Sequence, residues 1–128
     1  MPPMWNCKLL NEDQTRAWAS FVDKPCVIAI DGELGTGKTV FAQGIGAGLG
    51  IEEPIVSPTF IIVNQYESIC PFLHIDLYRL EANDLPSLGL DEEIEGWPGV
   101  VLIEWASKYP QLIPQNHLHV WLEHNDND

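Results

Sequence analysis

Positive charge is scarce in this chain. Its 128 residues hold 6 Lys and Arg against 19 Asp and Glu, so that the formal net charge is −13 at pH 7. Such a charge repels a nucleic-acid backbone, and the few basic residues form no stripe that a backbone would follow. The composition therefore argues against direct binding of nucleic acid.

Long apolar runs are also absent from the sequence. No uninterrupted apolar stretch approaches the roughly 20 residues that a membrane-spanning helix needs. The opening stretch MPPMWNCKLLNEDQ has no basic segment followed by an apolar one, which is the pattern of a secretory signal. With 45% hydrophobic residues, the chain is nevertheless too apolar to be disordered. We expect one soluble, cytoplasmic domain over residues 1–128, with residues 126–128 as a frayed acidic tail.

Cysteine is too sparse to frame a disulfide scaffold. Cys7, Cys26 and Cys70 are odd in number, lie far apart and contain no C-x-x-C pair, so we expect reduced thiols that serve only for packing. The histidines have no spacing typical of a metal site either, and ordinary surface or packing roles are favoured for them.

The apolar pattern that is present predicts a three-layer α/β domain. Helices are expected from Asn11 to about Lys24 and from Lys38 to Gly50, and a short helix or two helical turns within residues 81–96. Strands are expected at 26–30 and 100–104, which read as buried parallel strands, at 61–68 and 71–78, which could pair as a hairpin, and at 117–124, near a sheet edge. The sheet is therefore expected to be mixed and mainly parallel.

The stretch GELGTGKT, residues 32–39, fits the phosphate-binding pattern G-x-x-x-x-G-K-[ST] in full. It lies between an apolar strand and a helical pattern, which is the context that this motif requires. Its glycines let consecutive N–H groups point inward, and the helix that follows adds partial positive charge. Lys38 can then reach the β and γ phosphates of ATP, and Thr39 can offer its hydroxyl to Mg²⁺. The predicted nucleotide contacts are Gly32, Glu33, Leu34, Gly35, Thr36, Gly37, Lys38, Thr39 and Val40.

A nucleotide site also needs carboxylates for the metal and the attacking water. Asp76 closes the apolar stretch FLHID, and Glu104 closes VVLIE. Ligands bind at this end of the strands in open α/β sheets, although a carboxylate there is also common as a simple solvated strand end. Thr59, in SPTF, could sense the γ-phosphate, but its own context favours a turn-forming threonine.

Four segments, GELGTGKT, SPTF, HIDLYRL and LIEW, in this order and spacing, resemble the TsaE (YjeE) family, bacterial ATPases required for threonylcarbamoyladenosine formation in tRNA. The resemblance extends from the first expected helix through LIPQNHLHVWLEH. It implies a fold of the P-loop NTPase type. It also implies a protein that docks on the partner proteins TsaD and TsaB and uses ATP to reset them, without modifying tRNA itself.

The resemblance assigns roles to individual residues. It implies phosphate and Mg²⁺ contacts for Lys38 and Thr39, and a place near the nucleotide for Trp105. For Asp76 it implies an active-site acid and for Glu104 a glutamate associated with Mg²⁺, while Thr59 would lie in a switch-like loop. The sequence departs from the family at Glu33, where Asp or Asn is more usual, and in EWASKY, which lacks an acidic residue two positions after the tryptophan.

Two other functions are compatible with a phosphate-binding loop. A small-molecule kinase usually carries a lid with arginines that neutralise the transferring phosphoryl group. Only Arg16 and Arg79 exist in this chain, and no segment is long enough for a lid, so a kinase is the less favoured reading. The second alternative function is that of a binding module in which the nucleotide is purely structural.

Overall fold

The computed structural model describes residues 5–9, 12–20, 22–32, 37–56 and 63–122. These residues form a six-stranded sheet in the order β1-β6-β2-β5-β4-β3. The strands are β1 (Trp5–Leu9), β2 (Cys26–Gly32), β3 (Val63–Tyr66), β4 (Phe72–Asp76), β5 (Val100–Glu104) and β6 (Leu118–Leu122). Neighbouring strands are parallel except for β3 and β4, which form an antiparallel pair. The predicted mixed, mainly parallel sheet is confirmed, and so is the hairpin.

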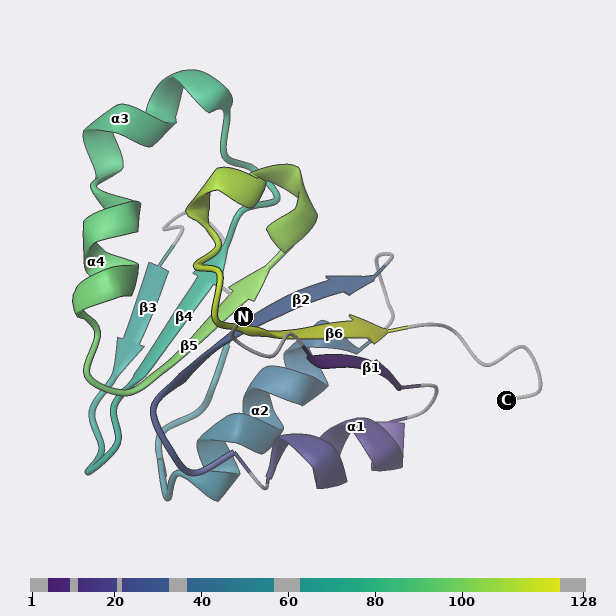
Figure 1. Cartoon of the computed structure of the whole chain (residues 1–128). Helices are drawn as coiled ribbons and strands as arrows, with labels where there is room; N and C mark the ends of the chain where they lie inside the picture. The colour runs from purple at the N-terminus through teal and green to yellow at the C-terminus, as the bar shows by residue number, and fades with distance from the viewer. Residues whose placement is uncertain (1–4, 10–11, 21, 33–36, 57–62, 123–128) are drawn as a thin grey trace.

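Helices cover both faces of this sheet (Figure 1). α1 (Glu12–Ala19) and α2 (Lys38–Gly48) lie side by side on one face. α3 (Leu85–Leu88) and α4 (Leu90–Gly96) lie next to the hairpin of β3 and β4, and α4 packs on the other face. Short 3-10 turns occur at η1 (Ala82–Asp84), η2 (Ala106–Lys108) and η3 (Pro110–Leu112). Within the described residues, no helix is both long and apolar enough to cross a membrane.

The central strands are buried on both faces, which explains their continuously apolar sequences. In β2, Ile28 and Ile30 face the core under α1 and α2, while Ala29 faces the core on the other side. β5 divides in the same way, with Val100 and Leu102 on the α2 face. This alternation sets the direction of the polar residues that end these strands, because every second residue shares a face.

The glycines of α2 serve helix packing. A Cβ on Gly44 would lie 2.7 Å from the Cβ of Ala19, and one on Gly48 would lie 2.5 Å from the carbonyl oxygen of Ser20. α1 can therefore approach α2 closely only because these positions carry no side chain. The helix ends where expected, since Gly50 adopts a φ of +74°.

The structure shortens the first helix, divides the helical segment 81–96 into short elements and adds a strand that was not predicted. The first helix ends at Ala19 rather than near Lys24, because Val22 N donates to Ala19 O and closes the helix in a tighter turn. The chain from Glu81 to Gly96 forms one 3-10 turn and two short α-helices. β1 was not predicted; it covers the edge of the sheet beside β6, which is therefore one strand away from the edge.

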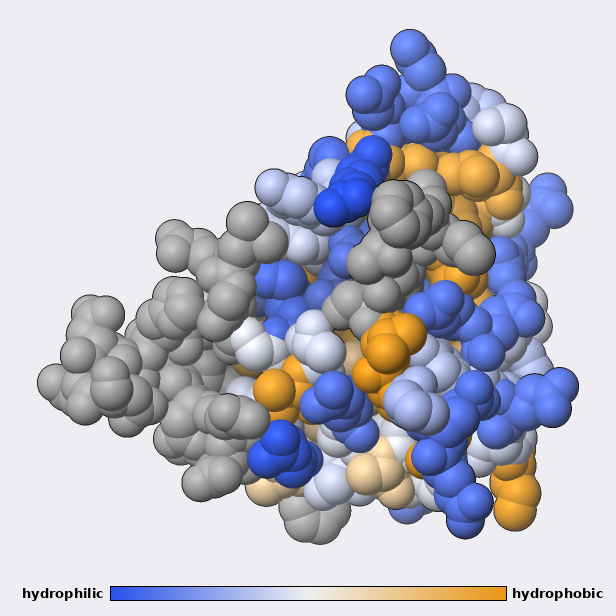
Figure 2. Space-filling model, turned by 180° about the vertical axis from the view of Figure 1, so that it is seen from behind, coloured by the Kyte–Doolittle hydropathy of each residue, from blue (hydrophilic) through white to orange (hydrophobic). Residues whose placement is uncertain are grey.

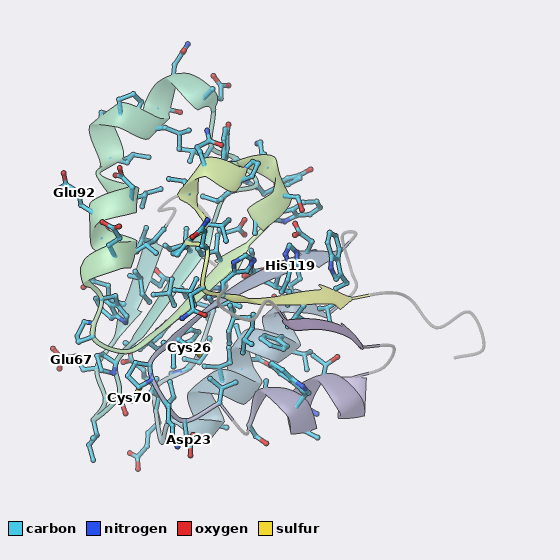
Figure 3. The ribbon with its side chains drawn as sticks, viewed as in Figure 1. Asp23, Cys26, Glu67, Cys70, Glu92 and His119 are labelled. Carbon is cyan, nitrogen blue, oxygen red and sulfur yellow. The ribbon has the colours of Figure 1, made fainter. Side chains whose placement is uncertain are left out.

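The two described cysteines are packing residues. Cys26 and Cys70 are free thiols, and burial, followed by the nearby Cys70, raises the pKa of Cys26 to about 11. They lie together at the end of the sheet away from His119 (Figure 3). The side chain of Cys7 lies outside the described set.

The far side of the molecule is mostly hydrophilic. In the space-filling view from behind, the coloured surface is largely blue, and the apolar side chains form separate clusters (Figure 2). The exposed large apolar residues are scattered in the same way along the chain, at Val56, Ile69, Leu88 and elsewhere. Scattered apolar side chains of this kind are normal for a folded domain.

Candidate functional site

The carboxyl ends of β2, β5 and β4 lie next to one another and form the floor of the site. The register pairs Ile30 with Glu104 across β2 and β5, and Asp76 with Glu104 across β5 and β4. Glu104 therefore stands between the strand that enters the phosphate loop and Asp76. Both carboxylates share the face of Leu102 and Phe72, on which α2 packs.

Lys38 is the first residue of α2 and is 7% exposed. Its Nζ donates a hydrogen bond to the carbonyl oxygen of Gly32 at 2.8 Å, so the lysine spans the whole loop from Gly32 to the helix. Burial lowers the pKa of Lys38, and the charges of Glu104 and Asp76, with that of Asp31, oppose this shift without cancelling it. A buried cation therefore stands at the start of a helix, where anions bind favourably.

Glu104 is the last residue of β5 and is 2% exposed. Its Oε2 contacts Nε2 of His74, which is itself fully buried on β4. A carboxylate only accepts hydrogen bonds, so the proton of this pair belongs on His74 Nε2. Within the described part of the chain, His74 Nδ1 has no hydrogen-bond partner.

Asp76 is the second acidic group of the site and is partly exposed. Burial raises its pKa, and the neighbouring Glu104 adds to the shift. A hydrogen bond from Tyr78 N to Oδ1, at 2.9 Å, and the charges of His74 and Lys38 oppose the shift in part. Asp76 is thus held in a setting that disfavours its own charge.

Trp105 leaves β5 in a left-handed conformation, with φ of 59°, and is the one non-glycine residue with positive φ among those described. Its backbone N donates to the carbonyl oxygen of Ile30 at 3.0 Å. The indole lies under Lys38, with Nζ 4.3 Å from the ring centroid, and its ring centroid is 4.8 Å from that of Tyr78. The chain therefore turns after Glu104, and the indole lies beside the lysine of the loop.

The remaining residues of the loop are only partly described. Gly37, with φ of +102°, precedes α2, Thr39 is exposed on the first helical turn, and Val40 is half-buried. Five predicted site residues lie outside the described residues: Glu33, Leu34, Gly35, Thr36 and Thr59. The structure thus brings together Gly32, Lys38, Asp76, Glu104 and Trp105, which come from distant parts of the sequence.

A magnesium ion fits this donor set only together with a nucleotide. In the residues that the structure describes, no group of three or more His, Cys, Asp or Glu is arranged to hold a metal ion by itself. Mg²⁺ is usually bound by one or two carboxylates or hydroxyls, together with substrate phosphates and water. Thr39, in the first turn of α2, and Glu104, at the end of β5, carry oxygen atoms of this kind.

Sequence reasoning missed His74 and His119. Each contacts a carboxylate near the end of a strand. His74 contacts Glu104, and His119 Nε2 lies 2.7 Å from Oδ2 of Asp31. A signal was present for His74, because in HID it shares a strand face with Asp76. No signal was present for His119, since its contact depends on the register of β6 against β2.

Replacing Asp76 with Asn is expected to stabilise the fold. Because burial raises the pKa of Asp76, its charged form is costly in the folded chain. The contribution of this group to stability is fully present below the ordinary value of 3.8, where the carboxyl is protonated, and is lost as pH rises through the folded pKa. Asn keeps an oxygen for Tyr78 N but carries no charge. We expect the midpoint of thermal unfolding to rise by a few degrees at pH 7, and the difference to vanish near pH 3. An equal midpoint for both proteins at pH 7 would contradict this.

Comparison with known proteins identifies the family. The model of the family described as threonylcarbamoyl adenosine biosynthesis protein TsaE matches residues 9–128. A protein of Nostoc sp. named tRNA threonylcarbamoyladenosine biosynthesis protein TsaE is 48% identical over 104 residues, which are 78% of this chain and 64% of the relative. The protein of the same name from Bacillus subtilis is 36% identical over 126 residues, 94% of this chain and 78% of the relative.

A solved structure shows the same fold. The crystal structure of Bacillus subtilis YdiB matches with a TM-score of 0.71 and 34% sequence identity, over 90% of this chain and 73% of YdiB. The chain spans 64% of the length of the Nostoc relative, slightly less than two thirds. The matches cover the phosphate loop, both strand-end carboxylates and the hairpin, and the chain belongs to the TsaE family, whose members are named for tRNA threonylcarbamoyladenosine biosynthesis.

Proposed function

We propose that this chain binds Mg-ATP at the phosphate loop and hydrolyses it slowly in support of tRNA threonylcarbamoyladenosine biosynthesis. One observation carries the proposal. Lys38 reaches back across the loop to Gly32 O at 2.8 Å, and the same lysine is close enough to Glu104 and Asp76 for both charges to affect its pKa. Sites of phosphoryl transfer combine a loop lysine that binds phosphates with side chains that hold Mg²⁺ and orient the attacking group, so this arrangement supports the proposal.

Each residue of the site would have a separate role in ATP hydrolysis. Lys38 would leave the Gly32 carbonyl and bind the β and γ phosphates, which are better acceptors because they are charged. Thr39 and Glu104 would hold Mg²⁺, which neutralises phosphate charge when it is bound. Asp76, whose raised pKa makes it a stronger base than an ordinary aspartate, would orient the attacking water.

The acidic surface suggests how the protein takes part in tRNA modification. A net charge of −13 is unsuited to holding tRNA directly. We therefore propose that it acts in the cytoplasm on the TsaD and TsaB proteins, and that ATP binding and hydrolysis reset them between cycles. The tRNA would be held by these partners.

Binding and hydrolysis assays, with and without the partners, test this proposal. Calorimetric titration with Mg-ATP is expected to show one site, and phosphate release is expected to be slow alone and faster with TsaD and TsaB. Transfer of phosphate to a small-molecule acceptor would favour a kinase instead. Binding without any phosphate release, even with the partners, would indicate a structural nucleotide. A chain that binds no ATP would refute the proposal.

Mg-ATP is also expected to change tryptophan emission through Trp105. Lys38 Nζ lies 4.3 Å from its ring centroid, and movement of this cation toward a phosphate would change the field on the indole. Trp105→Phe should remove most of the change. Trp97→Phe is the matched control, because Trp97 donates to Pro71 O in the loop before β4, away from the phosphate loop. A response that survives Trp105→Phe would place the reporter elsewhere.

A further inference from the structure

Asp31 carries a hydrogen-bond network that the phosphate-binding function does not use directly. It is the next-to-last residue of β2, immediately before Gly32, and is 6% exposed. Its side chain shares the face of Ala29, whereas Ile28 and Ile30 lie on the face that α2 covers. Asp31 therefore points to the side of the sheet opposite α2. Its carboxylate faces away from the side on which the phosphate loop leads into α2.

Three donors converge on this carboxylate. Ser107 N donates to Oδ1 at 3.0 Å, Ser107 Oγ donates to Oδ2 at 2.7 Å, and His119 Nε2 lies 2.7 Å from Oδ2. Burial raises the pKa of Asp31, but the hydrogen bonds from His119 and Ser107 outweigh burial and lower it overall. The group is therefore a carboxylate at neutral pH and accepts all three bonds, so the proton of His119 is on Nε2.

These donors come from two elements that are distant in sequence. Ser107 lies in η2, 76 residues after Asp31, and His119 lies on β6, 88 residues after it. His119 is in turn stacked on Trp121, with ring centroids 4.4 Å apart and planes 9° apart. Its place on β6, beside the end of β2, is visible in Figure 3. One buried side chain thus joins β2, β6 and η2.

The turn that Asp31 holds is the one that carries Trp105. Trp105 N donates to Ile30 O, and two residues later both donors of Ser107 bind Asp31, so consecutive residues of β2 fix both ends of the turn. A left-handed conformation is unfavourable for a bulky residue and persists only where its surroundings hold it. These hydrogen bonds supply that support, and the indole they fix lies under Lys38.

We infer that Asp31 is a positioning residue for the nucleotide site, which fixes the Trp105 turn against β2 and through it sets the place of Lys38. The inference rests on the proposed ATP binding at this loop. The mechanism is structural: Asp31 acts through Ser107 and Trp105 and does not itself need to touch ATP. The charge of Asp31 also acts on Lys38, where it favours the charged lysine. His119 contributes from β6 by holding the carboxylate in place.

Asp31→Asn tests the inference most directly. The Asn amide is neutral and has one acceptor oxygen, so its NH₂ group would replace Oδ2, and Ser107 Oγ and His119 Nε2 would have to change from donors to acceptors. We expect Mg-ATP to bind about tenfold more weakly by calorimetry, corresponding to the loss of one charge-assisted hydrogen bond. The emission response of Trp105 should shrink as well, measured in a Trp121→Phe background because Trp121 stacks on His119.

Matched variants separate positioning from loss of stability. Val22→Ala removes core volume near the opposite end of β2 and should lower the unfolding midpoint without weakening ATP binding. If Asp31→Asn does not fold, His119→Phe and His119→Gln replace it, since Phe keeps a ring against Trp121 without a donor and Gln keeps a donor. Weaker binding with Phe and rescue with Gln support the inference.

Three results would overturn it. In the first, the Kd of Asp31→Asn for Mg-ATP is within about twofold of the parent value and the Trp105 response is unchanged. In the second, His119→Phe and His119→Gln have equal Kd values for Mg-ATP. Either leaves the proposed function intact, because the parent still binds ATP. In the third, the parent itself binds no Mg-ATP, and then the proposed function fails and this inference fails with it.

Discussion

Lys38→Ala is expected to abolish tight ATP binding. The lysine is 7% exposed, is already poised over the loop by its bond to Gly32 O, and is the cation that Glu104 and Asp76 face. Without it, the phosphates would enter a pocket in which two carboxylates have lost their opposing charge. A hydrogen bond to a charged group is worth up to about 3 kcal/mol, so we expect Kd for Mg-ATP to rise by about 100-fold or more.

Calorimetric titration measures this effect, and two variants control it. Lys24→Ala removes an exposed lysine just before β2, at the end of the strand away from the loop, and should leave Kd unchanged. Lys38→Arg keeps the charge but places a planar fork where a point charge is needed, so partial loss is expected. Parent-like Kd values for Lys38→Ala would show that the loop is not the nucleotide site.

The sequence predicted the fold well because its strongest patterns are local. The continuous apolar runs at 26–30 and 100–103 lie in β2 and β5, and most of their residues are buried, as expected for parallel strands covered on both faces. β1 was missed although WNCKL alternates apolar and polar residues, because the stretch is only five residues long, holds no β-branched residue and becomes a strand through pairing with β6. Its place at the edge of the sheet depends on tertiary context, which a local pattern does not encode.

The site was predictable where a motif or a strand end marks it. Lys38, Asp76 and Glu104 follow from the phosphate-loop pattern and from strand ends, and the structure brings them together. The supporting residues were not predictable in this way. His74 contacts Glu104, and His119 contacts Asp31, only because particular strands are neighbours in a particular register. A single histidine in an apolar stretch carries no sign of which carboxylate lies beside it.

Glu104→Gln is expected to separate hydrolysis from binding. Glutamine has nearly the same size and keeps an oxygen that can accept a hydrogen bond from His74 Nε2, so the packing at this 2% exposed position should survive. The charge that would hold Mg²⁺ is lost. Removing one preorganised electrostatic group typically lowers kcat by about 100-fold, whereas Lys38 and the loop still bind the phosphates. We therefore expect phosphate release to fall by about 100-fold, with Kd for ATP within about threefold of the parent.

The dependence of binding on metal gives this prediction its sharpest test. In the parent, Kd for ATP should be much tighter with Mg²⁺ than with a chelator, and in Glu104→Gln this difference should shrink, because one side of the metal site is neutral. Glu92→Gln on α4, which removes an exposed charge away from the loop, is the control and should behave as the parent does. If Glu104→Gln turns over ATP at the parent rate and keeps the full effect of Mg²⁺, the metal is held elsewhere. Glu104 would then serve only to hold His74 within the core, where the two side chains already contact each other.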